Sequence, residues 1–210
     1  MSEARVQSPE VLIGIVGYSP VVDPYPLGPK LMAALESGIA GRDNIAVENM
    51  TWGPIHIVQR FQDEGAIRPR RIVLVGAASV SCVPGRVRSF RWMGGSPPAQ
   101  AMQERVYEAV TGVVDIENTL VIGTHFDIWP DEAYSVEVDL PADTFGNMVI
   151  ADSQGGGDDP DFSPQAVIAE LAETALALAL AQPAAAAQAK SVADCAKVEP
   201  FTRNRIAAGG

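Results

Sequence analysis

The residues with the clearest potential for chemistry are Asp23 and the chain's only two histidines, His56 and His125. Each lies close to the end of an apolar run, where a loop beside a strand is expected. Imidazole and carboxylate groups are ligands that transition metals accept. One interpretation is a metal site built from Asp23, His56 and His125, with Asp127 as a further candidate. The other is that each histidine makes a structural hydrogen bond.

A second group of residues suits binding. Six arginines fall within 24 residues of an otherwise acidic chain: Arg68, Arg70, Arg71, Arg86, Arg88 and Arg91. Arginine binds carboxylates through two parallel hydrogen bonds, so the cluster could dock an acidic segment of a partner. The alternative is a solvated edge that balances nearby acids. The predicted substrate or partner contacts are Thr51, Trp52, Gly53, Arg86, Arg88 and Arg91.

Cysteine usage gives little support for thiol chemistry. Cys82 and Cys195 are 113 positions apart and form no CxxC pair. A disulfide framework is not expected, and the thiols fit a reducing cytoplasm. Cys82 could act as a nucleophile if a base approached it, but the pattern favours a partly buried thiol.

The composition excludes several classes of partner. The 210 residues include 15 basic and 26 acidic side chains, a formal charge of −11, which opposes general nucleic-acid binding. The start of the chain does not resemble a signal peptide. The most apolar stretch, residues 167–181, contains Glu170 and Glu173 and is too short and too charged to span a bilayer. We therefore expect a cytoplasmic monomer with no membrane contact and no permanently bound cofactor.

The chain alternates between strand and helix patterns. Continuous apolarity, typical of strands covered on both faces, predicts strands at 11–17, 71–77 and 119–123. A weaker strand is expected at 44–51, where Ala46 and Glu48 interrupt the run, and a further strand at 86–92. Helices are predicted from Pro29, from Pro54 to Glu64, from Pro97-Pro98 and from Ser163-Pro164 to about residue 181. Val136 and Val138 indicate an edge strand. Residues 1–182 are expected to form one α/β domain, a doubly wound three-layer sandwich with a mostly parallel central sheet. The Ala-rich residues 183–210 are expected to be a disordered tail.

Three segments follow apolar runs and would line the crevice at the carboxyl ends of such a sheet. The first runs from Gly17 to Pro29, the second contains Thr51 and Gly53, and the third runs from Gly76 to Gly85. In their order and spacing they resemble the hydrogenase maturation proteases, cytoplasmic endopeptidases that trim the C-terminus of a nickel–iron hydrogenase large subunit. The matching positions are Gly17, Val21, Val22, Asp23, Leu27, Gly28, Pro29, Thr51, Gly53, Ala77, Pro84 and Gly85. The resemblance covers about residues 11–181 and implies a phosphorylase/hydrolase-like fold.

The resemblance also implies a nickel-recognition set that this chain largely lacks. The family recognises nickel in its substrate through an acidic residue in the first loop, an aspartate after the third strand and a histidine that opens the third helix. Here Asp23 is available for the first position, Gly76 replaces the aspartate, and the third helix opens with Ser96-Pro97-Pro98. One carboxylate alone does not hold nickel.

Two functions remain open at this point. The resemblance implies an endopeptidase directed by the nickel of a hydrogenase large-subunit precursor, with Asp23 as the remaining contact and His56 or His125 in place of lost donors. The alternative is a non-catalytic assembly or binding protein on the same scaffold, for which the stiff first loop with Pro24, Pro26 and Pro29 is suited. A generic small-molecule hydrolase or nucleotide binder is a third class.

Overall fold

A computed structural model describes residues 9–63, 68–78, 83–110, 115–140, 144–154, 163–181 and 188–195, apart from the side chains of 150–154. Within these ranges the elements are, in order, β1 (Val11–Val16), α1 (Pro29–Gly38), β2 (Ile45–Met50), α2 (Pro54–Gln62), β3 (Arg71–Ala77), β4 (Val87–Trp92), α3 (Ala99–Val110), α4 (Ile116–His125), β5 (Glu132–Val138), α5 (Thr144–Gln154), α6 (Pro164–Leu180), β6 (Gln188–Lys190) and the 3-10 turn η1 (Val192–Asp194).

The described strands form one six-stranded sheet in the order β2-β1-β3-β5-β4-β6. Strands β2, β1, β3 and β5 are parallel, whereas β4 is antiparallel to β5 and β6 is parallel to β4. Strand β1 is buried along its whole length and β3 along nearly all of it, which is why both are continuous apolar runs in the sequence. The predicted α/β architecture with a mostly parallel central sheet is confirmed.

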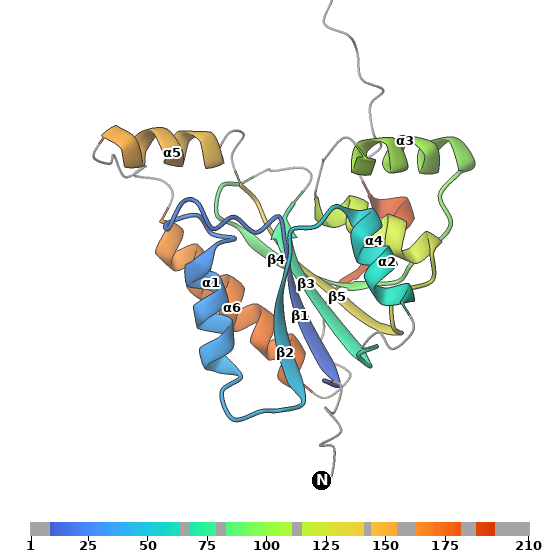
Figure 1. Ribbon diagram of the computed structural model, residues 1–210, viewed down its shortest axis with the longest axis horizontal. Helices are drawn as coiled ribbons and strands as arrows, with labels where there is room; N and C mark the ends of the chain where they lie inside the picture. The colour runs from blue at the N-terminus through green and yellow to red at the C-terminus, as the bar shows by residue number, and fades with distance from the viewer. Residues whose placement is uncertain are drawn as a thin grey trace, which may run out of the picture.

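Helices cover both faces of the sheet (Figure 1). On one face, Leu31 and Leu35 of α1 pack with α6 against β1, β3 and β5. On the other, Ile57 and Phe61 of α2 and Leu120 of α4 pack against the opposite side of the same strands. Because α1 opens with Pro29 and α6 with Ser163, whose hydroxyl accepts a hydrogen bond from the Ala166 N–H, both helices begin where the sequence predicts.

The segment 119–123, predicted as a strand, belongs instead to helix α4. Every residue from Ile116 to Gly123 is buried, so this helix lacks the polar face that identifies most helices in a sequence. Asp115 fixes its start, because its side chain accepts a hydrogen bond from the backbone N–H of Asn118 at 2.7 Å. The strand prediction was wrong because a short buried run fits a strand and a helix equally well.

Strand β5 is central, so the prediction of an edge strand around Val136 and Val138 was also wrong. It lies between β3 and β4, and both valines are completely buried. The sequence from Tyr134 to Val138 alternates apolar and polar residues, which is typical of a strand with one solvent-facing side, but Ser135 and Glu137 on the other face of β5 are buried as well.

Part of the predicted disordered tail belongs to the sheet. Residues 188–190 form β6 beside β4, and η1 follows directly. Disorder was therefore a wrong prediction for residues 188–195; the remainder of 183–210 lies outside the described residues. Composition favoured disorder here, but the segment is fixed to the sheet because Lys190 is buried and forms an ion pair with Glu137 of β5. Among the described residues, no helix has the length and apolarity needed to cross a membrane.

Candidate functional site

The carboxyl ends of the parallel strands bring the three predicted loops to one edge of the sheet. Val16 pairs with Met50 and Ile15 pairs with Val75. Gly17, Thr51 and Ala77 therefore follow neighbouring positions on three adjacent strands, and the β1–α1 and β2–α2 connections leave the same end of the sheet (Figure 1). This edge is the crevice region expected for an open α/β sheet.

The loop after β1 is closed by its own backbone. The N–H of Ser19 donates to the carbonyl of Leu27 at 2.9 Å, and the N–H of Tyr25 donates to that of Val22 at 3.0 Å. A Cβ on Gly28 would come within 2.9 Å of the Tyr25 carbonyl oxygen, so a glycine is required for this close approach. The loop presents Asp23, whose side chain is 69% exposed and forms an ion pair with Lys30 at 2.7 Å.

The three predicted metal ligands lie on different elements. Asp23 and the exposed His56, in the first turn of α2, follow the carboxyl ends of β1 and β2. His125 ends α4 next to Thr124, whose hydroxyl accepts a hydrogen bond from Trp92 at 2.7 Å. Since β4 is antiparallel to β5, Trp92 lies beside the start of β5, so His125 is at the opposite edge of the sheet. The structure does not bring His125 to Asp23 and His56, and within the described ranges no three metal-binding side chains are grouped.

Gly76 stands where the family has the aspartate after the third strand, and neighbouring atoms leave little space for a side chain there. A Cβ on Gly76 would lie 3.1 Å from the Cβ of Ile116 and 3.4 Å from the carbonyl oxygen of Val16. Ile116 is the first residue of α4 and is completely buried. A carboxylate at position 76 would therefore meet the buried end of α4 instead of an open crevice.

We expect Gly76→Asp to lower the free energy of unfolding by about 1–3 kcal/mol through overpacking and charge burial, without creating nickel affinity. Urea unfolding and nickel titration by calorimetry measure the two quantities. Gly146→Asp is the matched control, because a Cβ at Gly146 meets no atom within 4 Å. A Gly76→Asp variant as stable as the native chain would show that the space is available after all.

The arginine cluster of the sequence divides into separate groups. Arg70 and Arg71 both bind Glu132, at the start of β5. Arg86 and Arg88 both bind Asp139, at the end of β5. Arg91 is exposed near Asp127 and Trp129, around a second hollow at the opposite edge of the sheet from Asp139. Only Arg86 and Arg88 therefore lie on the same edge as Thr51, Trp52 and Gly53.

Trp52 is an exposed aromatic residue of this edge. It comes directly after Thr51 in the chain and is 46% exposed. The guanidinium carbon of Arg60 lies 5.6 Å from the centroid of its ring. Arg60 is also bound to Glu48 of β2. Gly53 precedes α2 and lies close to the end of α3, since a Cβ there would be 3.5 Å from the Ala109 carbonyl oxygen. Trp52 is thus available for contact with a partner.

A buried charge network that the sequence did not reveal lies between β5, β6 and α4. The ammonium of Lys190 is 2.8 Å from both carboxylate oxygens of Glu137 and 2.8 Å from Oε1 of Glu117. Ser135 donates a further hydrogen bond to Glu137, and Arg105 of α3 approaches Glu117 at 3.9 Å. Burial lowers the pKa of Lys190, but its hydrogen bonds to Glu117 and Glu137 outweigh burial and raise the pKa above its ordinary value. Lys190 is therefore a permanent cation at neutral pH.

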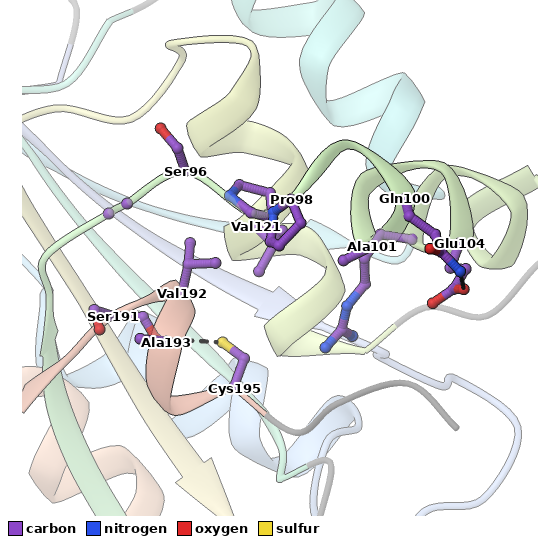
Figure 2. A pocket seen from close by; sticks show the side chains of 14 residues that line it. Ser96, Pro98, Gln100, Ala101, Glu104, Val121, Ser191, Val192, Ala193 and Cys195 are labelled. Carbon is purple, nitrogen blue, oxygen red and sulfur yellow. Dashed lines mark hydrogen bonds between the residues drawn. The ribbon is translucent and has the colours of Figure 1, made fainter. Parts of the chain in front are cut away.

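Next to this network, a cavity of about 560 Å³ separates α3 and α4 from the C-terminal segment. Figure 2 shows Pro98 and Val121 on one side of the cavity and Val192 and Cys195 facing them from η1 and the residue after it. Gln100 and Glu104 of α3 lie at a distance from the 3-10 turn. The volume is within the range of small-molecule pockets, but the lining is mainly apolar and offers no arrangement of nucleophile and base.

The Cys195 thiol in this cavity is unreactive by its environment. Burial, with a smaller contribution from the charge of Glu117, raises its pKa to about 12. Its Sγ lies 3.5 Å from the Ser191 carbonyl oxygen. Cys82, the other cysteine, lies outside the described residues.

We expect Cys195 to be alkylated by iodoacetamide at pH 8 at least about tenfold more slowly in the folded chain than in urea, because the thiolate is the reacting species. Peptide mapping by mass spectrometry separates Cys195 from Cys82, and the urea-unfolded chain is the control. Equal rates in the two states would contradict a protonated, enclosed thiol.

Comparison of the chain with models of protein families, with curated proteins and with solved structures gave no match. The residues that sequence reasoning missed are Glu117, Glu137, Asp139 and Lys190. Three of these are acidic side chains within or next to apolar runs, and this unusual position was the available signal.

Proposed function

We propose that this protein is a divergent relative of the hydrogenase maturation proteases and acts on the C-terminal segment of a nickel-containing hydrogenase large-subunit precursor. The nickel belongs to the precursor and is part of the substrate. In this proposal the protein works in the cytoplasm as a monomer. The carboxyl edge of the sheet receives the precursor, and Asp23 is the carboxylate that approaches its metal.

The observation that supports this proposal is the convergence of the three family-like segments. Gly17, Thr51 and Ala77 follow adjacent positions on β1, β2 and β3, as a single site requires. Asp23 is exposed on a backbone-closed loop at this edge, where its ion pair with Lys30 is solvent-exposed and of low energetic cost to break. The position, exposure and charge of Asp23 are those expected of a residue that contacts the precursor.

A second candidate is a non-catalytic protein that holds the precursor without cutting it. The packing around Gly76 favours this function, because the place of a second metal-recognition carboxylate is closed by Ile116. The exposed Trp52 and the arginines of the same edge remain suited to protein contact.

The experiment that tests both candidates combines two readouts on one mixture. We expect the purified protein, in excess over nickel-loaded precursor, to remove the C-terminal extension, which intact-mass spectrometry detects as a loss of mass. Nickel-free precursor is the control and should keep its mass. Co-purification without mass loss would support the binding function instead. If the precursor is neither shortened nor retained, both candidates are wrong.

A further inference from the structure

We propose that Arg86 and Arg88, positioned by Asp139, bind the terminal carboxylate of an extended peptide at the carboxyl edge of the sheet. The inference rests on the proposed function, in which the ligand is the C-terminal segment of a precursor. It adds the chemical group that is recognised and the residues that recognise it.

Asp139 is the fixed point of this site. It follows β5 directly, is completely buried, and receives the backbone N–H of Val83 on Oδ2 at 3.2 Å. Its own N–H donates to the Arg86 carbonyl at 2.9 Å, and its carbonyl accepts the N–H of Gly85 at 2.8 Å. Hydrogen bonds to the backbone and to the carboxylate of Asp139 therefore fix this residue, so its side chain does not move with the arginines.

Both arginines are oriented by this carboxylate. Arg86 donates Nε and Nη2 to Oδ2 of Asp139 at 3.3 and 3.0 Å, and Arg88 donates Nη2 to Oδ1 at 2.5 Å. These contacts do not engage Nη1 of either guanidinium. The side chains of Arg86 and Arg88 are 42% and 33% exposed, so both reach solvent.

The charge and donor balance of the site favours an anion. Two guanidinium groups share one carboxylate, which leaves an excess of one positive charge in this cluster. The Nε of Arg88 is buried and has no hydrogen-bond partner. A carboxylate is the oxyanion that matches the paired donors of an arginine. Because Asp139 already restricts both side chains, little further side-chain entropy is lost on binding.

The ligand is a peptide because of where the site lies. Ala78 directly follows β3, and its backbone N–H donates to the carbonyl of Val138, the residue before Asp139, at 2.8 Å. The arginine pair therefore lies beside the carboxyl end of β3. Polyanions such as nucleic acids are disfavoured by the chain's charge of −11. A single carboxylate at the end of an extended chain carries the required charge without that repulsion.

The test measures binding of a fluorescein-labelled peptide with the precursor's C-terminal sequence, by fluorescence anisotropy. We expect the free-acid peptide to bind the native protein about tenfold more tightly than its C-terminally amidated form. Arg88→Gln and Arg86→Gln should each weaken the free acid by a similar factor and leave the amide unchanged. Arg91→Gln is the matched control, because Arg91 is exposed on the same strand but, three residues from Arg88, projects from the opposite face of the sheet.

The comparison of free-acid and amidated peptide uses the native protein, so it does not depend on the folding of any variant. Equal affinity for acid and amide would overturn the proposal, while mass loss of the whole precursor in the separate assay would still stand for the proposed function. A titration with sodium acetate, followed by the NMR signal of the Arg88 Nε–H, needs no precursor and should shift that signal more than sodium chloride does. An acetate shift without any peptide binding would reject a peptide as the ligand of the arginine pair, while the mass-loss assay on the whole precursor would still decide the proposed function.

Discussion

Lys190→Met is expected to lower the free energy of unfolding by about 3–5 kcal/mol, since removal of the cation from a buried ionic cluster takes away the ion pair of the Glu137 carboxylate. The ammonium contacts three carboxylate oxygens at 2.8 Å, and Glu117 and Glu137 would be left close to each other. Urea unfolding followed by circular dichroism measures the change. Hydrogen exchange should also show that residues 188–195 lose protection, because Lys190 is the buried residue of β6.

Lys30→Met is the control for this prediction. Lys30 is also a lysine paired with a carboxylate, but its pair with Asp23 is exposed, so the change should remain within about 1 kcal/mol. The stability from Lys190 should persist below pH 10.5, the ordinary value, and be lost only as pH rises through its raised pKa. A loss that begins near neutral pH, or equal effects of the two substitutions, would contradict the role assigned to Lys190.

Arg71→Met is expected to cost about 3–4 kcal/mol, because a buried guanidinium at the end of α6 would be lost. Arg71 is 2% exposed, and its Nη1 donates to the carbonyl oxygens of Leu178 at 2.8 Å and Ala181 at 2.6 Å. Its Nε binds Glu132 at 2.6 Å. Carbonyls at the end of a helix have no partner within the helix, so these bonds cap α6 and join it to β3.

Arg70→Met provides a closely matched comparison for Arg71→Met. Arg70 binds the other oxygen of Glu132 at the same distance of 2.6 Å, yet its side chain is 55% exposed. We expect a cost of no more than about 1 kcal/mol for Arg70→Met. If chemical denaturation gives similar values for the two variants, the contacts of Arg71 with α6 do not contribute as described.

The convergence of the first three loops could be predicted from the sequence, whereas the content of the site could not. Parallel strands that follow one another through helices place their carboxyl ends at one edge, so Gly17, Thr51 and Ala77 were expected together. His125 was misplaced because the preceding segment is a helix, which carries the chain to the opposite edge. One wrong element therefore removed one residue from the predicted metal site.

The arginines illustrate the same limit at the level of single side chains. Spacing alone grouped Arg86, Arg88 and Arg91, but an odd step along a strand reverses the side-chain direction, so Arg91 points away from the other two. The partner of Arg86 and Arg88 is Asp139, more than fifty positions away. No local pattern identifies such a pair.

The sequence by itself determined the α/β class, the runs that become β1 and β3, and the helices that open at Pro29 and Ser163. These features depend on local periodicity and on backbone preferences of proline and capping residues, which act within a few positions. Only the tertiary structure decided that 116–125 is a helix and that 188–190 is a strand. Both depend on burial by distant residues: Lys190 joins the sheet through Glu137, 53 positions earlier, and a contact of that kind leaves no trace in local composition.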